Sequence, residues 1–446
     1  MKKKQLRWTL WTIASPFILF IILCILIYLP PIQNFLVDKA AVYASEATGM
    51  NISVGRISLS FPLNLVVTDV DAASPHKDTL LSVRRLQVNV QLLPLLKKQV
   101  EVDGISLQGA TVNSNDLIHG MRLNGTLGEL FISSHGVALD PETAIVNKVL
   151  LKDTNLSLCL NDTAAADTAA SDTTYWKIIL QDIDLQNVSF ALDMPLDSLS
   201  LAASLDNATL RDGLIDLHKS AYSLQTFRIK NGRVRYDSGR PSATASADSL
   251  SAGLDPSHIA LTDIGVKLDS LYYEGRNMKA IISQFVLKER SGVEIVSTEG
   301  RLVSNDKVLR VPSLKLETWD SYLELNAAMD WDALDFKKEG LVSARLMADI
   351  GKPDVVRFMG SMDEKFIRKY PSEPLRIRTG IDGDLNKLKL TTLTAELPGA
   401  LELFAKGELT SLTDSLLRGG DITLQAETKD LKFISTLAEG IEIPYG

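Results

Sequence analysis

The stretch LQVNVQL, residues 86–92, indicates the fold class of this chain. Apolar and polar side chains alternate along it without a break, which is the period of a β-strand with one apolar face. The same alternation recurs from about residue 52 to residue 443, with Gly, Asn and Asp between the segments, at 105–107 (ISL), 156–160 (LSLCL), 183–185 (IDL), 199–201 (LSL), 314–316 (LKL) and 388–390 (LKL). A mainly β body is therefore predicted.

One local pattern recurs within this body: a short apolar-x-apolar strand, a polar or Gly step, and a second short strand. It reads ISLQGATVN (105–113), LLKDTNLSL (150–158), IDLQNVSFAL (183–192) and FRIKNGRVRYD (227–237). The irregular spacing disfavours a propeller or a strict solenoid. We expect a loosely repetitive array of about 30 short strands, each about 4.8 Å from the next.

An uncharged, strongly apolar run precedes the β pattern. Residues 9–29 (TLWTIASPFILFIILCILIYL) are long enough to cross a bilayer core of about 30 Å, and the basic residues 2–4 and 7 come just before them. The positive-inside rule predicts a single-pass anchor with a cytoplasmic N-terminus, residues 1–8, and an exported body. A cleaved signal peptide is the alternative, but its apolar region is normally only about 7–15 residues. The predicted anchor residues include Leu10, Trp11, Phe17, Leu19, Leu23, Leu26 and Tyr28.

Helices and loops are predicted at a few places outside the strands. Residues 31–48 have apolar positions at helical spacing and are followed by Gly49, which predicts a short amphipathic helix. Residues 161–174 and 240–252 are low-complexity segments of small polar residues, which favours exposed loops. The best later helix candidate is 352–362 (KPDVVRFMGSM).

Composition and motifs argue against several classes of function. A net charge of −8 disfavours nucleic-acid binding, and Cys159 is the only cysteine outside the predicted anchor, so no internal disulfide is expected. The five histidines are scattered without metal-ligand spacing, and Asp330, Asp332 and Asp335 do not match a calcium loop. No nucleotide-binding or hydrolase motif occurs. We therefore predict no enzyme activity, no catalytic residues, no cofactor and no metal.

The order of elements near the N-terminus carries a family resemblance. After the predicted anchor and helix come TGMNISVGRISLSFPLNLVVTDVD (48–71) and DTLLSVRRLQVNVQLLPLLKKQVEVDGISLQGATV (78–112). This succession resembles the AsmA-like superfamily of Gram-negative envelope proteins, and most closely its TamB branch. The matching positions are Thr48, Gly49, Ile52, Val54, Gly55, Ile57, Leu59, Asp78, Leu80, Leu81, Val83, Leu92, Leu93, Leu95, Leu96, Lys97, Lys98, Ile105, Leu107, Gly109 and Val112.

The resemblance implies an inner-membrane protein whose periplasmic body is an elongated, curled β-sheet with an open apolar groove. It covers about the first 115 residues, so residues 50–160 are the TamB-like region and 175–446 continue the groove in style only. TamB proteins are much longer and end in a domain that meets an Omp85-type outer-membrane partner. This chain therefore resembles either a short relative or a part of a longer protein.

The apolar face of such a sheet needs a partner, and two arrangements provide one. A second sheet would complete a sandwich, whereas a curled sheet leaves a trough that acyl chains can fill. The low content of Phe, Trp and Tyr, 6%, suits an aliphatic groove lining, and the resemblance favours the groove. The predicted lining residues are Val88, Val90, Leu107, Leu158, Leu185, Leu201, Leu316 and Leu390.

Two functions follow as hypotheses. The first is a lipid-transfer conduit that moves phospholipid from the inner membrane towards the outer membrane along the apolar groove. The second is a scaffold for outer-membrane protein translocation or assembly, which would offer a free sheet edge to nascent strands together with an Omp85-type partner. An anchored enzyme is a third class of function, and no constellation of residues supports it.

Overall fold

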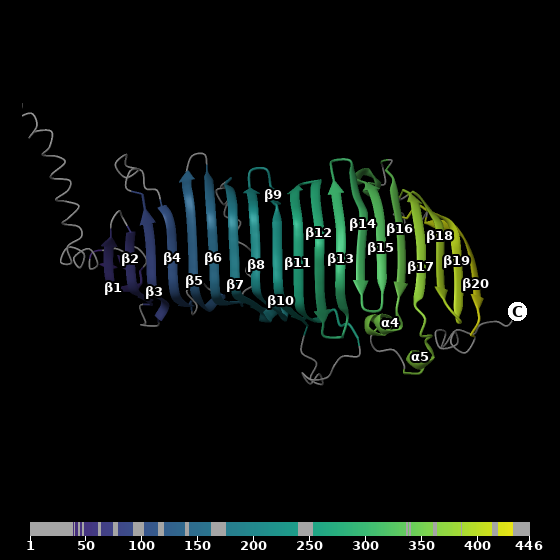
Figure 1. Ribbon diagram of the computed structural model, residues 1–446, viewed down its shortest axis with the longest axis horizontal. Coiled ribbons are helices and arrows are strands. Elements are labelled where there is room, and N and C mark those ends of the chain that lie inside the picture. Colours follow the sequence, from purple (N-terminus) through teal and green to yellow (C-terminus); the bar gives the residue numbers. More distant parts are fainter. Residues whose placement is uncertain are drawn as a thin grey trace, which may run out of the picture. The chain divides into compact units, whose positions relative to one another are not determined.

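The described part of this computed structural model is mainly β (Figure 1). The chain divides into two compact units. The first unit takes Met1–Ser171 and Ile183–Asp193, and the second takes Asp172–Asp182 and Met194–Gly446. The structure describes residues 39, 41–42, 45–46, 49–60, 64–74, 79–91, 102–114, 120–138, 142–161, 175–239, 253–335, 338, 340–359, 364–384, 386–412 and 418–430.

The predicted anchor and both low-complexity loops lie wholly or almost wholly outside the described residues. Among the residues that are described, no helix is both long enough and apolar enough to span a bilayer. In the predicted amphipathic helix, the described residues 39, 41–42 and 45–46 are helical. The chain turns out of the helix at Gly49, whose φ is +69° and whose N–H donates to the Ser45 carbonyl at 2.9 Å.

The first unit is built from strands that pair with their neighbours in the sequence. Each pairing is antiparallel, and the order is β1–β2–β3–β4–β5–β6. Short connections explain this order, because consecutive antiparallel strands need only a hairpin turn. The strands are β1 Asn51–Ser60, β2 Asn64–Ala73, β3 Thr79–Val90, β4 Val102–Asn113, β5 Met121–Ala138 and β6 Thr143–Leu160; β7, Lys177–Met194, has residues in both units.

The second unit continues the antiparallel hairpin pattern with one departure. A short strand and a longer one, β9 and β10, lie end to end between β8 and β11, and each pairs with both. From β11 to β20 each strand pairs with the next.

The strands of this unit are β8 Leu199–Asp216, β9 Ala221–Leu224, β10 Thr226–Ser238, β11 His258–Glu274, β12 Asn277–Glu289, β13 Glu294–Ser304, β14 Val308–Thr318, β15 Tyr322–Asp330, β16 Val342–Ile350, β17 Leu375–Gly383, β18 Lys387–Leu397, β19 Leu401–Thr410 and β20 Gly419–Thr428. Its helices are the 3-10 turns η1 Pro195–Asp197 and η2 Trp331–Leu334, and the α-helices α4 Lys352–Met359 and α5 Glu364–Lys369. The helix predicted at 352–362 is confirmed by α4, and α5 was not predicted.

The recurring sequence pattern is not a turn between two short strands, and that prediction is wrong. Each of the four copies lies in one continuous strand, namely β4, β6, β7 and β10. At the polar or Gly step the backbone is left-handed, with φ of +62° at Gly109, +50° at Asp153, +51° at Asn187 and +52° at Asn231. Gly, Asn and Asp adopt this conformation more readily than other residues.

The left-handed step changes the phase of the side-chain alternation within a strand, as a β-bulge does. In β4, the next residue after Leu107 on the same face of the sheet is Ala110 and not residue 109. In β10, the next residue after Ile229 on its face is Gly232. The neighbouring strand leaves space at these steps. A Cβ built on Gly128 of β5 would lie 2.7 Å from Cβ of Asp153. The described residues therefore form fewer and longer strands than the sequence suggested, 20 in all.

The α-helices α4 and α5 lie at one end of the strands of the second unit (Figure 1). Val355 of α4 and Phe366 of α5 join Tyr370, Leu397 and Ala400 in a cluster of buried residues, which Ile350, Leu375 and Leu401 surround. We call this the rim cluster. It lies where β16 and β18 end and β17 and β19 begin, so it packs at the ends of these strands and does not cover a face of the sheet. Burial raises the pKa of Tyr370.

A buried carboxylate attaches α4 to the same end of the strands. Asp354, which is fully buried, accepts hydrogen bonds from the hydroxyls of Thr318 and Ser321 in the β14–β15 turn. Arg357 pairs with Asp354 at 3.0 Å and with Asp320 at 3.2 Å. These contacts satisfy the charge that burial would otherwise penalise.

Candidate functional site

The pairing registers place aliphatic side chains opposite one another across the first unit. Residues directly opposite in an antiparallel pair project to the same face of the sheet. Val88 of β3 is opposite Leu65 of β2 and Ile105 of β4, and Ile105 is opposite Ile132 of β5. A parallel row, Leu86, Leu107, Leu130 and Leu151, runs beside the first. Together these rows form an apolar face over β2 to β6.

The second unit has an apolar face of the same kind. Val234 of β10 is opposite Ala203 of β8 and Leu261 of β11. Later strands continue with Leu314 opposite Leu325, Leu325 opposite Leu346, and Leu388 opposite Leu409. The alternate positions on these strands carry charged and polar groups, such as Lys315 opposite Glu324. Each unit therefore presents one aliphatic and one polar face.

The predicted lining residues all lie in strands, and the side chains of all eight are half-buried. Val88 and Leu107 lie on the apolar face of the first unit, as just described. The others are found opposite the following residues: Val90 opposite Val102, Leu158 opposite Leu123, Leu201 opposite Tyr236, Leu316 opposite Thr298 and Leu323, and Leu390 opposite Ile381. Leu185 lies in β7, two positions before Asn187, whose backbone is left-handed.

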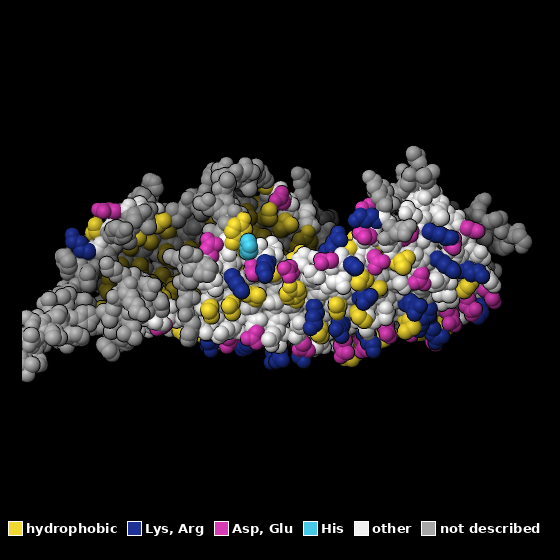
Figure 2. All heavy atoms as spheres, turned by 90° about the horizontal axis from the view of Figure 1, so that it is seen from above, with side chains coloured by type: hydrophobic (Ala, Val, Ile, Leu, Met, Phe, Trp, Pro, Cys, Tyr) yellow, Lys and Arg dark blue, Asp and Glu magenta, His cyan; other side chains and the backbone are white. Residues whose placement is uncertain are grey.

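Among the described residues, no second layer of buried side chains covers these faces. The rim cluster is the one group of buried hydrophobic residues that pack together, and the one large side chain that is fully buried is Asp354. Several large apolar residues on the apolar faces remain exposed, including Ile105 and, at 61%, Leu424. Seen from above in Figure 2, hydrophobic side chains line hollows over the first unit and over the β8–β13 part of the second, while the charged side chains lie mainly on the outer surface, with some hydrophobic ones among them.

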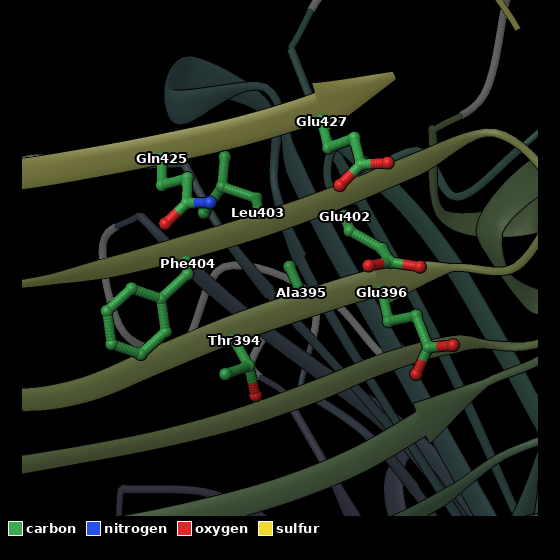
Figure 3. A pocket seen from close by; sticks show the side chains of 8 residues that line it. All are labelled: Thr394, Ala395, Glu396, Glu402, Leu403, Phe404, Gln425 and Glu427. Carbon is green, nitrogen blue, oxygen red and sulfur yellow. The ribbon is translucent and has the colours of Figure 1, made fainter. Parts of the chain in front are cut away.

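A different candidate is a pocket of about 290 Å³ on the polar face of β18 to β20 (Figure 3). Three glutamates lie in one row across the strands: Glu396 is opposite Glu402, which is opposite Glu427. Two of them have cationic partners, because Arg376 pairs with Glu396 at 3.5 Å and Lys429 pairs with Glu402. These ion pairs offset the repulsion between the neighbouring glutamates. The row is therefore explained as ordinary cross-strand pairing on the polar face of the sheet.

Several other titratable groups of the described residues have partners within the fold. His258 contacts Asp255 at 3.0 Å, and the ring of His218 lies edge-on to Tyr175. In the acidic run, Asp330 accepts from the Leu341 N–H and Asp332 pairs with Lys338. Within the described ranges, no three His, Cys, Asp or Glu side chains are placed to hold a metal ion.

No family model matches the sequence, and no curated protein matches it significantly. The apolar faces therefore define the candidate site on their own geometry.

Sequence reasoning missed the aromatic residues of the site. Tyr222 and Tyr273 lie opposite each other in β9 and β11, on the apolar face with Ile215. The signal was present at 271–273 (LYY), because alternation from Leu271 places Tyr273 on the apolar face and Tyr272 on the polar face. The short strand β9 gave no such signal, since four residues are too few to show a period.

Proposed function

We propose that this protein is a lipid-transfer conduit whose apolar faces bind the acyl chains of phospholipid. The observation that carries the proposal is the pairing of aliphatic residues over consecutive strands, which no buried core covers among the described residues. An apolar face of this extent needs an apolar partner, since exposure to water costs about 25 cal/mol for each Å². Acyl chains supply such a partner and can slide along it, because the aliphatic lining is non-directional.

The direction and the cellular setting are part of the same proposal. The uncharged run 9–29 behind a basic N-terminus would anchor the chain in the inner membrane and place the body in the periplasm. Phospholipid would then enter from the inner membrane and move towards the outer membrane. This agrees with the resemblance of residues 48–112 to the TamB branch.

A matched pair of charge substitutions in β4 tests the proposal. Leu107 lies on the apolar face, whereas Thr111 is exposed on the polar face of the same strand. We expect Leu107→Glu to lower the phospholipid that co-purifies with the full chain, measured by lipid mass spectrometry, at least several-fold. Thr111→Glu should leave it unchanged. Wild-type protein free of phospholipid would overturn the proposal, as would equal loss in both variants.

The scaffold hypothesis has one observation in its favour. All ten residues of β20 are exposed, and among the described residues this strand pairs only with β19. A nascent outer-membrane protein strand could add to the other edge by β-augmentation, with an Omp85-type partner receiving it. This function predicts crosslinks from β20 to barrel proteins, and indifference to Leu107→Glu.

A further inference from the structure

An aromatic pair marks one end of the apolar face in the second unit. The rings of Tyr222 and Tyr273 lie 6.1 Å apart between centroids, at an interplanar angle of 31°. Their side chains are 40% and 43% exposed, which is unusual for two neighbouring aromatic residues on the apolar side of a sheet. Tyrosine suits a boundary between apolar and aqueous surroundings, because its ring is apolar and its hydroxyl is polar.

The pairing continues from this aromatic pair to a tryptophan. Met278 of β12 is opposite both Tyr273 and Ser304 of β13. The hydroxyl of Ser304 accepts a hydrogen bond of 3.2 Å from Nε1 of Trp331, which also donates to the carbonyl of Asn305 at 2.8 Å. The apolar face therefore ends in a belt of aromatic and thioether groups near the turns of β11–β12 and β13–β14.

Two cationic residues adjoin this belt. Arg276, in the β11–β12 turn, places its guanidinium carbon 5.5 Å from the centroid of the Trp331 ring, so a cation–π contact orients it. The second is Lys307, in the β13–β14 turn. Its backbone carbonyl accepts a hydrogen bond of 2.8 Å from the backbone N–H of Trp331. Neither cation has a carboxylate within 4 Å in the part of the chain that is described.

Carboxylates lie at the same turns. Asp306 is next to Lys307, and within the described ranges its one hydrogen bond is a weak one of 3.5 Å from the side-chain amide of Asn277. Asn277 follows Arg276 directly, so an acidic and a basic side chain that do not pair with each other both lie at these two turns. That arrangement suits a ligand that carries both a phosphate and an ammonium group.

We propose that a second group of residues, which we call the head-group site, binds the zwitterionic phosphate–ammonium head group of a phospholipid. It consists of Tyr222, Tyr273, Arg276, Asp306 and Trp331. Arg276 holds the phosphate with a charge-assisted hydrogen bond, Asp306 holds the ammonium, and the acyl chains lie along the apolar face past the two tyrosines. The inference rests on the proposed function and adds the class of head group and the place where it binds.

Three fluorescent lipids with the same labelled acyl chain test the proposal on the detergent-purified full chain. They are phosphatidylethanolamine, phosphatidylglycerol, which lacks the ammonium, and diacylglycerol, which lacks the whole head group. We expect wild-type protein to bind phosphatidylethanolamine about tenfold more tightly than diacylglycerol, with phosphatidylglycerol between them. Arg276→Gln should remove the preference of both phospholipids over diacylglycerol, and Asp306→Asn should remove only that of phosphatidylethanolamine over phosphatidylglycerol.

Two controls keep the outcome specific. Arg301→Gln alters an exposed arginine opposite Ser313 on the polar face and should change nothing. Tyr273→Ala should weaken the binding of all three lipids, whereas Tyr272→Ala, which alters a residue on the polar face, should leave the binding of all three unchanged. Preferences that survive Arg276→Gln would overturn the head-group site.

The remaining outcomes separate the two proposals. If wild-type protein binds none of the three lipids, the conduit itself is wrong. If it binds all three with equal affinity, the conduit stands and the head-group site is wrong. Excess inorganic phosphate should compete with the head group at Arg276 and weaken the binding of phosphatidylethanolamine. If inorganic phosphate binds there while wild-type protein shows no preference for phosphatidylethanolamine over diacylglycerol, Arg276 takes free phosphate and the head-group site is wrong.

Discussion

The side-chain amide of Asn187 donates a hydrogen bond of 2.8 Å to Oδ1 of Asp153, and both residues have a left-handed backbone. The bond joins two copies of the recurring sequence pattern, one in β6 and one in β7. The pattern thus marks the places where strands change the phase of their alternation, and in these two copies the polar residues contact each other.

Asn187 offers a direct test of the left-handed step. We expect Asn187→Val to lower the free energy of unfolding by about 1–3 kcal/mol, because a β-branched residue is strained at this φ. Asn187→Gly keeps the backbone angle accessible and loses only the side-chain bond, so it should cost about 1 kcal/mol or less. Urea denaturation of the full chain, followed by circular dichroism, measures both. Equal losses would show that the backbone angle is unimportant.

Asp354 is expected to stabilise the α4 end of the second unit. Asp354→Ala leaves the hydroxyls of Thr318 and Ser321 without their buried acceptor, and we expect a loss of about 2–4 kcal/mol. Asp320→Ala removes only the more exposed partner of Arg357 and should cost less than about 1 kcal/mol. Hydrogen exchange at the β14–β15 turn reports the difference. Unchanged protection in Asp354→Ala would contradict the assignment.

The rim cluster predicts unequal roles for two phenylalanines. Phe366 is 5% exposed within the cluster, whereas Phe358 on α4 is 54% exposed. Phe366→Ala should lower the free energy of unfolding by about 3–5 kcal/mol through the cavity it leaves. Phe358→Ala should change it by less than about 0.5 kcal/mol. Thermal denaturation of the two variants against wild type is sufficient, and similar melting temperatures would count against a cluster that packs as described.

Glu289 should make stability depend on pH in the acid range. Burial alone would raise the pKa of Glu289, but hydrogen bonds from Ser291 and the Ala260 N–H outweigh it and lower the pKa below its usual value. The stability it contributes is therefore complete above about pH 4.3, the pKa of an unfolded Glu, and is lost as pH falls through the lower folded pKa. In denaturation series at several pH values, Glu289→Gln should lose this acid dependence. A variant with an unaltered acid dependence would exclude Glu289 as its source.

The sequence was sufficient for the class of fold and for the faces of most strands. Strict alternation in 86–92 and 314–316 predicts which side chains share a face, and the registers of Val88 and Leu316 agree with it. The helix α4 was also predictable, since Pro353 and the spacing of Val355 and Val356 fit a first turn.

The sequence could not distinguish a left-handed step inside a strand from a turn between strands. Both use Gly, Asn or Asp between apolar alternations, as at Gly109 and Asp153, and only the register on the neighbouring strand separates them. The residues of the proposed head-group site could not be predicted from the sequence for a similar reason. Arg276 and Trp331 are 55 residues apart in numbering, and their contact depends on three intervening strand pairings.

The pairing of almost every strand with its neighbour in the chain bears on how the protein is made. A hairpin can close as soon as its second strand has been synthesised, without waiting for any distant segment. Folding can then proceed from the first strands to the last, each finished strand serving as the template for the next. Chains cut after β6 should accordingly already resist protease over β1 to β5, while their newest strand remains open to digestion.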